Sequence, residues 1–282
     1  MNTYSDYNYT TVPTQFVEAN GIRFAYRSYG KQGGVPVIYL NHLAAVLDNC
    51  DPRVMDGIAS QHYIISFDYR GVGATSGIAP DTISAMATDV IAFIKALGFN
   101  KVDLLGFSLG GMVSQEILLQ EPQLVRKVIL AGTGPRGGFG MNNITKITYI
   151  DILRGYLTFR DPKFYLFFTQ TENGKNAARQ FLKRLLERTE NRDTKISIKT
   201  MNIQLKAIHA WSLEAPADLS SIKHPVFVVN GDNDRMVPTP NSYDMAKRFP
   251  NSELIIYSDS GHGGIFQNHE VFVQQVLAFL SK

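Results

Sequence analysis

The sequence has one cysteine, little excess charge of either sign and no long hydrophobic run. Cys50 is the single cysteine among its 282 residues, which excludes an internal disulfide and a metal site built from several cysteines. Lys and Arg number 28 against 25 Asp and Glu, and the formal net charge of +3 argues against nucleic acid as a partner. No apolar stretch approaches the ~18 residues of a spanning helix, and the N-terminus has no signal-peptide pattern. We therefore expect a cytoplasmic chain without a membrane anchor whose partner is a small molecule.

Short β-rich segments alternate with helical patterns along most of the chain. Hydrophobic residues make up 44% of the sequence, enough for a sizeable core. Asn20-Gly21 separates two short apolar stretches and is typical of a type I′ turn, which predicts an antiparallel hairpin at the start. Short, β-branched segments predict buried strands at 35–40, 63–67, 102–106, 125–131, 226–230 and 254–257. The pattern predicts the α/β class, with a mostly parallel eight-stranded sheet and helices on both faces.

The alternation breaks between about residues 140 and 214, where helical patterns follow one another without a strand. We interpret 140–214 as a helical cap inserted into a core of 13–139 and 215–282, and residues 1–12 as a flexible arm. One cap helix should begin with Asp161 as N-cap and Pro162 at N1. Aromatic residues of the cap are candidates for lining a pocket, namely Phe159, Phe164, Tyr165, Phe167, Phe168 and Trp211.

The proposed cap also carries most of the excess positive charge. It holds 13 Lys or Arg against 7 Asp or Glu, whereas the other residues hold 15 against 18. A basic lid would favour anionic substrates. The simpler interpretation, which we prefer, is that Lys183, Arg184 and Arg188 solvate the outer face of a helix.

The strongest motif is the hexapeptide GFSLGG at 106–111, centred on Ser108. It directly follows an apolar strand and opens a helical segment, 112–121, that stops at Pro122. A serine hydroxyl is a weak nucleophile and must be presented on a tight strand-to-helix turn, where glycines avoid steric conflict and helix N–H groups favour negative charge. The motif therefore predicts a nucleophilic serine.

A base for this serine should lie on a loop at the carboxyl end of a strand. His262 meets that requirement, because the glycine-flanked loop 258–264 follows the strand expected at 254–257. Three carboxylates compete for the role of the acid that orients the base. Asp232 and Asp234 share one loop, and Asp259 lies close to His262 in the sequence.

Five segments together resemble the α/β-hydrolase superfamily, in particular the small-cap branch that includes cofactor-free haloperoxidase-like esterases. They are LNHLAAVLDNCDP at 40–52, DYRGVGATS at 68–76, GFSLGG at 106–111, NGDNDRMVP at 230–238 and SGHGG at 260–264. The resemblance covers nearly the whole chain and keeps the family order of Ser, Asp and His. It implies an α/β-hydrolase fold and a serine enzyme without a metal or other cofactor.

The family pattern also assigns roles to single residues. It places the acid three residues after a glycine and before Val-Pro, which selects Asp234 rather than Asp232. Of the two backbone N–H groups in the oxyanion hole, Leu109 supplies one. Relatives have glycine after the histidine that matches His42, whereas this chain has Leu43; we favour the Leu43 N–H as the second donor, with Ala44 as the fallback. Asp68 and Arg70 should fix the loop beneath the site.

These residues predict hydrolysis of a small carboxylic ester or related acyl compound through an acyl-enzyme. Lactonase, thioesterase, C–C hydrolase and perhydrolase reactions are compatible with the same residues, because the pocket selects among them. A different kind of function is a sensor that binds or slowly cleaves a small signal and passes a cap rearrangement to a protein partner. The chain is expected to be a monomer or a homodimer.

Overall fold

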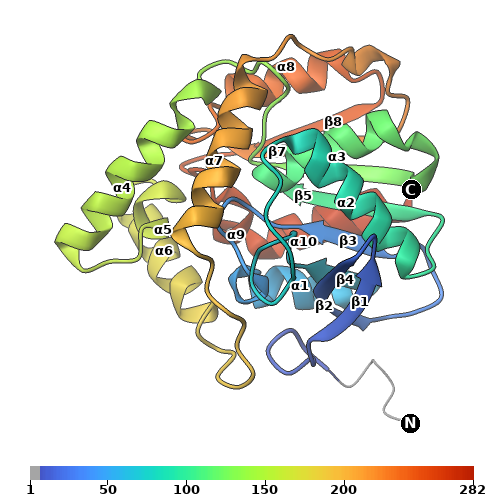
Figure 1. The fold of residues 1–282 in the computed structure, drawn as a ribbon. Helices are drawn as coiled ribbons and strands as arrows, with labels where there is room; N and C mark the ends of the chain where they lie inside the picture. Colours follow the sequence, from blue (N-terminus) through green and yellow to red (C-terminus); the bar gives the residue numbers. More distant parts are fainter. Residues whose placement is uncertain (1–6) are drawn as a thin grey trace.

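The computed structural model describes residues 7–282, which build one eight-stranded sheet between layers of helices (Figure 1). The strand order is β1-β2-β4-β3-β5-β6-β7-β8. β2 runs antiparallel to β1 and β4, and all other neighbouring pairs are parallel. The strands are β1 (Gln15–Ala19), β2 (Ile22–Gly30), β3 (Val37–Leu40), β4 (Tyr63–Phe67), β5 (Val102–Phe107), β6 (Val125–Ala131), β7 (Val226–Gly231) and β8 (Ser252–Tyr257).

The predicted hairpin joins β1 to β2. Asn20 and Gly21 adopt φ of 49° and 75°, both in the left-handed region that a type I′ turn requires. The six further predicted strands are also confirmed, with boundaries that shift by two residues or fewer. The eight-stranded, mostly parallel sheet expected from the sequence is therefore present.

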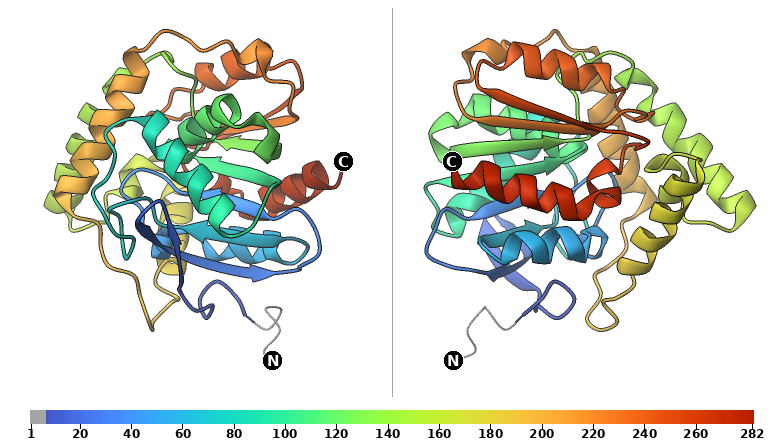
Figure 2. Two further views of the ribbon diagram at one scale, coloured as in Figure 1. Left: turned by 45° about the vertical axis from the view of Figure 1, so that its right-hand side comes forward. Right: turned by 180° about the vertical axis from the view of Figure 1, so that it is seen from behind.

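Helices cover both faces of the sheet (Figure 2). α1 (Pro52–Ala59) packs against α10 (His269–Ser281) on one face, and α2 (Ile83–Ala96) packs against α3 (Leu109–Gln120) on the other. The remaining helices are α4 (Ile144–Thr158), α5 (Lys163–Leu166), α6 (Glu172–Arg184), α7 (Ile198–Leu213), α8 (Pro240–Arg248) and α9 (Gly264–Gln267). Within residues 7–282, no helix combines the length and the apolar composition needed to cross a bilayer.

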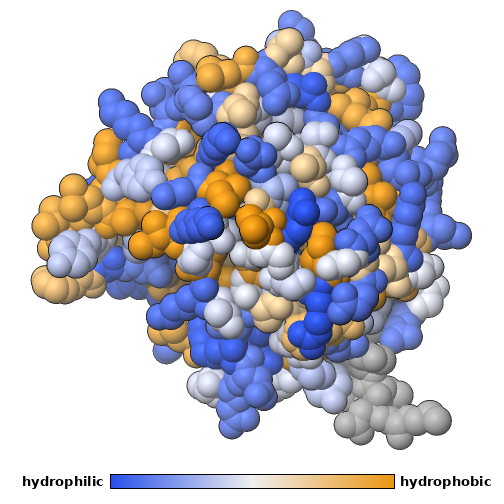
Figure 3. Space-filling model, in the orientation of Figure 1, coloured by the Kyte–Doolittle hydropathy of each residue, from blue (hydrophilic) through white to orange (hydrophobic). Residues whose placement is uncertain are grey.

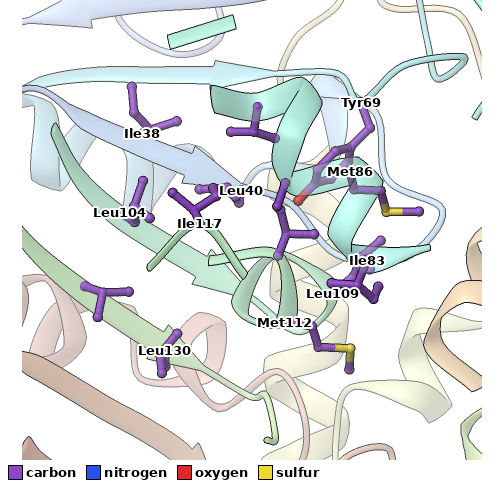
Figure 4. Close-up of a cluster of buried hydrophobic side chains, with 14 of the residues drawn as sticks. Ile38, Leu40, Tyr69, Ile83, Met86, Leu104, Leu109, Met112, Ile117 and Leu130 are labelled. Carbon is purple, nitrogen blue, oxygen red and sulfur yellow. The ribbon is translucent and has the colours of Figure 1, made fainter. Parts of the chain in front are cut away.

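Alternate residues of the central strands point to opposite faces of the sheet and pack into two separate hydrophobic cores. In β3, Ile38 and Leu40 belong to a cluster that lies against α2 and α3, part of which is shown in Figure 4. Val37 and Tyr39 belong to a second cluster that includes residues of α1 and α10. All four side chains are at most 1% exposed, so both faces of β3 are buried, which explains why its sequence is continuously apolar.

Four helices, α4 to α7, lie between β6 and β7 in the sequence and form a separate group beside the sheet (Figures 1 and 2). We retain 140–214 as the proposed cap. α5 begins at Lys163, one residue later than the cap pattern suggested, because Pro162 occupies the N-cap position. Asp161 still stabilises this start, since its carboxylate accepts the Lys163 N–H at 2.8 Å.

The structure corrects two expectations about the surface. Tyr9 and Val12 are 2% and 0% exposed, so this part of the expected arm 1–12 is packed into the fold; residues 1–6 lie outside the described range. Arg184 and Arg188 are also buried, whereas Lys183 is exposed. Both arginines point inward because buried carboxylates of the core, Asp51 and Asp48, lie opposite them.

Candidate active site

Ser108 lies on a sharp turn between β5 and α3. Its backbone adopts φ 55° and ψ −114°, a strained conformation for a residue with a side chain. Two glycines make the turn possible: a Cβ on Gly106 would collide with the Gly110 carbonyl, and a Cβ on Gly110 would collide with the Leu40 carbonyl. The strand-turn-helix context expected for a nucleophilic serine is thus present around Ser108.

The three predicted side chains come together although 154 positions separate Ser108 from His262. The distance from His262 Nε2 to Ser108 Oγ is 2.9 Å, and the distance from His262 Nδ1 to Asp234 Oδ2 is 2.7 Å. All three residues are at least 93% buried. Because a carboxylate only accepts, Nδ1 carries the proton, and the Nε2 lone pair faces the serine hydroxyl.

Asp232, the rejected alternative, has a different set of partners. Its carboxylate accepts the backbone N–H groups of Asp259 and Ser260, both at 3.1 Å, and so holds the loop that carries His262. Asp234 instead directs its second oxygen, Oδ1, to the N–H groups of Met236 and Val237 at 2.8 and 2.9 Å. These bonds fix the Asp234 carboxylate in its position beside His262.

The loop after His42 contains the candidate second oxyanion donor. The Ala44 N–H donates to the Gln204 Oε1 of α7 at 2.9 Å, and Ala44 takes up φ 58°. Leu43 and Leu109 donate their N–H groups to no residue within 7–282. The loop is anchored further along by Asp68, whose Oδ1 accepts the Leu47 N–H at 2.9 Å.

Arg70, predicted to act with Asp68, has a different partner. Its Nε forms an ion pair with Asp89 of α2 at 2.8 Å. It therefore ties the 68–76 loop to a core helix, and only Asp68 contacts the loop that follows His42.

His42 stays neutral in this site. Burial, together with the nearby Lys163 ammonium, lowers the pKa of His42 from 6.5 to about 3. Its Nδ1–H donates to the Leu43 carbonyl at 2.7 Å, and its ring meets those of Phe107 and Phe167 edge to face. His42 thus shapes the loop through its ring packing and this hydrogen bond.

A cavity of about 200 Å³ opens beside Ser108 and His262. Its lining combines the core loop after His42 with the proposed cap. The lining residues are His42, Leu43, Ala44, Ser108, Thr148, Ile152, Asp161, Pro162, Lys163, Leu166, Phe167, Met201, Met236 and His262. Apart from the reacting groups, most of them are apolar, so the site suits a small and largely uncharged substrate.

Of the six cap aromatics considered, only Phe167 lines this cavity. Phe159 is 97% exposed, and Phe164 and Trp211 are buried in the core clusters. Sequence reasoning missed Leu166, Met201 and Met236, because helical spacing shows which residues share a face but not which face meets the cavity.

The cap also holds the histidine loop in place. The Gly263 N–H donates to the Phe167 carbonyl at 2.7 Å, and the Phe167 ring centroid lies 5.5 Å from that of His262. A Cβ on Gly261 would approach the same carbonyl at 2.7 Å. The glycines on both sides of His262 therefore allow α5 and the loop to lie in close contact.

Comparison with known proteins agrees with this architecture. The sequence model of the family described as "alpha/beta hydrolase fold" matches residues 35–269. A solved α/β-hydrolase fold protein from Chitinophaga pinensis is 38% identical in sequence and superposes with a TM-score of 0.93. The match covers 97% of this chain and 99% of that protein.

Two curated relatives are more distant in sequence. "Putative carbamate hydrolase RutD" of Rhizobium rhizogenes is 27% identical over 80% of this chain and 85% of its own. "Putative non-heme bromoperoxidase BpoC" of Mycobacterium tuberculosis is 23% identical over 92% of this chain and 98% of its own. The family match, the sheet order and the serine turn lead to one conclusion: the chain is a hydrolase that belongs to the α/β-hydrolase family.

Proposed function

We propose that this hydrolase cleaves small carboxylic esters or related acyl compounds through an acyl-enzyme formed on Ser108. The observation that carries the proposal is a continuous hydrogen-bonded line that begins at Ser108 Oγ in the wall of an apolar cavity and runs through His262 to Asp234. A line of this kind is what activation of a serine hydroxyl requires.

In the proposed reaction, His262 Nε2 takes the hydroxyl proton while Ser108 Oγ adds to the substrate carbonyl. Asp234 stabilises the imidazolium that forms, without taking the proton itself. The proton then passes to the leaving alcohol, and the acyl group stays on Ser108. Water, activated by His262 in the same way, releases the acid and restores the serine.

We assign the oxyanion to the N–H groups of Leu43 and Leu109. Support for Leu43 comes from the bond between the Ala44 N–H and Gln204, because an amide already bonded to a buried side chain is the poorer donor. Leu109 is the first residue of α3, where the helix dipole favours negative charge. One such donor contributes about 100- to 1,000-fold in rate.

The cavity limits the substrate more than the reacting residues do. Its volume of about 200 Å³ lies below the ~300 to 1,000 Å³ of pockets for drug-sized ligands, which favours short acyl chains. Lactones, thioesters, C–C bonded diketones and perhydrolysis need the same attack on a carbonyl and stay within the proposal. The relative from Rhizobium rhizogenes is named "Putative carbamate hydrolase RutD", and carbamate hydrolysis would also begin with attack on a carbonyl.

The test is hydrolysis of nitrophenyl esters from acetate to long chains, together with labelling by a serine-directed phosphonate. We expect saturable turnover that favours short chains, and a covalent adduct on Ser108. Ser108→Ala should abolish labelling and lower kcat by at least ~1,000-fold. Labelling without turnover would favour the sensor instead, and turnover that survives in Ser108→Ala would refute the mechanism.

A further inference from the structure

The outward face of α4 is apolar, although most of it is in contact with solvent. Its side chains at helical spacing form what we call the α4 stripe: Tyr149, Ile150, Leu153, Tyr156 and Leu157. Their exposed fractions are 45%, 51%, 57%, 78% and 66%. Apolar side chains gather at the same place in Figure 3, along the left edge of the molecule over α4.

The opposite face of α4 already serves the fold. Ile144, Thr148, Asp151 and Gly155 are buried, and Thr148 and Ile152 line the cavity beside Ser108. The helix is thus apolar on both faces, because Ile144, Ile147 and Ile152 face the core or the cavity while the stripe faces outward. A surface helix that packs only on its own core is polar on its outward face, so the outward face needs a separate explanation.

The exposed apolar area is large for a surface that stays in water. At ~200 Å² for a whole aromatic side chain, Tyr149, Tyr156 and the adjoining Phe159, which is 97% exposed, together present roughly 400 Å². The three aliphatic residues of the stripe add to this. A monomer rarely exposes a continuous patch of more than a few hundred Å², whereas a standard interface buries about 800 Å² per partner.

We propose that the α4 stripe binds the same stripe of a second copy of this chain. The stripe is centred on Leu153, so two antiparallel α4 helices related by a twofold axis would place Leu153 against Leu153 of the second copy. At 15 residues α4 is about 22 Å long, and its outer face offers a straight apolar surface that fits its own copy.

The neighbouring charges favour a second copy over an anionic membrane. A helix that lies on anionic lipid carries cations around its apolar face. In contrast, α4 carries only two cations in its 15 residues, Lys146 and Arg154, and the Arg154 guanidinium lies 4.0 Å from the centroid of the Tyr165 ring.

The first experiment is sedimentation velocity over a range of concentrations. The native chain should sediment as a dimer at micromolar concentration. Leu153→Glu should raise the dissociation constant at least ~30-fold, because it places two carboxylates against each other at the centre of the interface. Val271→Glu is the matched control: Val271 is 49% exposed and also lies on a helix, α10, and its substitution should leave the dimer unchanged.

A cross-linking experiment tests the register as well as the association. Cys50 is 2% exposed, so Leu153→Cys adds a single accessible thiol to each chain. Mild oxidation should link Leu153→Cys through a disulfide into a covalent dimer, whereas Val271→Cys should form no covalent link between its two chains.

A native chain that is monomeric at 50 µM would overturn the proposal. A dimer that persists in Leu153→Glu and does not cross-link through Leu153→Cys would also overturn it, because the interface would lie elsewhere. Flotation of the native monomer with anionic vesicles, lost in Leu153→Glu, would make the stripe a membrane-binding surface and refute the dimer.

Discussion

At the scale of single residues, two aspartates on one short loop have different neighbours and different expected roles. Asp234 is 6% exposed and bonds His262 together with two backbone amides. Asp232 is exposed and bonds the backbone of the histidine loop. We expect the first arrangement to orient a base and the second to hold the loop in place.

Asparagine at each position separates the two roles. Asp234→Asn should lower kcat for ester hydrolysis by about 10,000-fold, because the amide favours the wrong tautomer of His262. Asp232→Asn should change kcat by less than ~10-fold and lower the free energy of unfolding by about 1 kcal/mol or less. Steady-state kinetics and urea unfolding of both variants measure this. A comparable loss of kcat in the two variants would contradict the assignment of Asp234.

His42 should make stability depend on pH. Its pKa is about 3 in the folded chain against 6.5 in the unfolded chain, because burial disfavours the charged ring. As the pH falls from 6.5 towards 3, the unfolded state therefore binds one more proton than the folded state. The stabilising contribution of neutral His42 is complete above pH 6.5 and is lost progressively in that window.

His42→Asn removes this titration. Between pH 6 and 4, the free energy of unfolding of the native chain should fall more steeply than that of the variant, by up to about 1.4 kcal/mol per pH unit. Denaturant unfolding at several pH values measures both slopes. Equal slopes would mean that His42 can be protonated in the folded chain.

At the scale of helices and strands, α6 is attached to the core through a buried ion pair. Arg184 Nε donates to Asp51 at 2.9 and 3.1 Å, Nη2 donates to the same carboxylate at 2.6 Å, and Nη2 also donates to the Phe266 carbonyl at 3.0 Å. Asp51 also caps α1 by accepting the Arg53 N–H. One arginine therefore connects α6, α1 and the C-terminal end of α9.

Loss of this arginine should destabilise the chain strongly. Arg184→Ala leaves the Asp51 carboxylate buried without its cation and should lower the free energy of unfolding by about 3 to 5 kcal/mol. Lys183→Ala, at the exposed neighbouring position, should change it by less than about 0.5 kcal/mol. Guanidinium unfolding of both variants checks the difference. Similar values would show that the ion pair adds nothing to stability.

At the scale of the whole molecule, one network joins the N-terminal segment, the core and the loop that follows α6. Arg188 Nη1 donates to the carbonyls of Tyr9, Thr10 and Val12 at 3.3, 3.2 and 2.9 Å. Asp48 forms ion pairs with Arg27 at 2.8 Å and with Arg192 at 3.4 Å, and it accepts the Asp193 N–H at 2.8 Å. The N-terminal segment is therefore held by residues that are distant in the sequence.

Arg188→Ala should loosen this segment. Hydrogen exchange should become at least ~10-fold faster for amides of residues 9–12, because the three carbonyls lose a charged donor. Arg179→Ala, an exposed change on α6, should leave their exchange unchanged. Mass-spectrometric exchange over peptides of this segment measures the effect. Unchanged protection in Arg188→Ala would show that burial of Tyr9 and Val12 alone holds the segment.

Strand positions, the α/β class and the identity of Ser108 and His262 as candidate residues could be predicted from the sequence. Each depends on local chemistry: alternation and β-branching define strands, and a glycine-flanked serine between a strand and a helix defines its turn. The same logic placed Asn20-Gly21 in a hairpin. These features need no knowledge of distant residues.

Other features were decided only when distant segments met. The inward direction of Arg184 and Arg188 depends on Asp51 and Asp48, which precede them by more than 130 positions. The contact between Gln204 and the Ala44 N–H, and the choice of Phe167 over the other cap aromatics, depend on how the cap lies against the core. Sequence period specifies which residues share a face of a helix, whereas the packing of one element on another decides what that face touches.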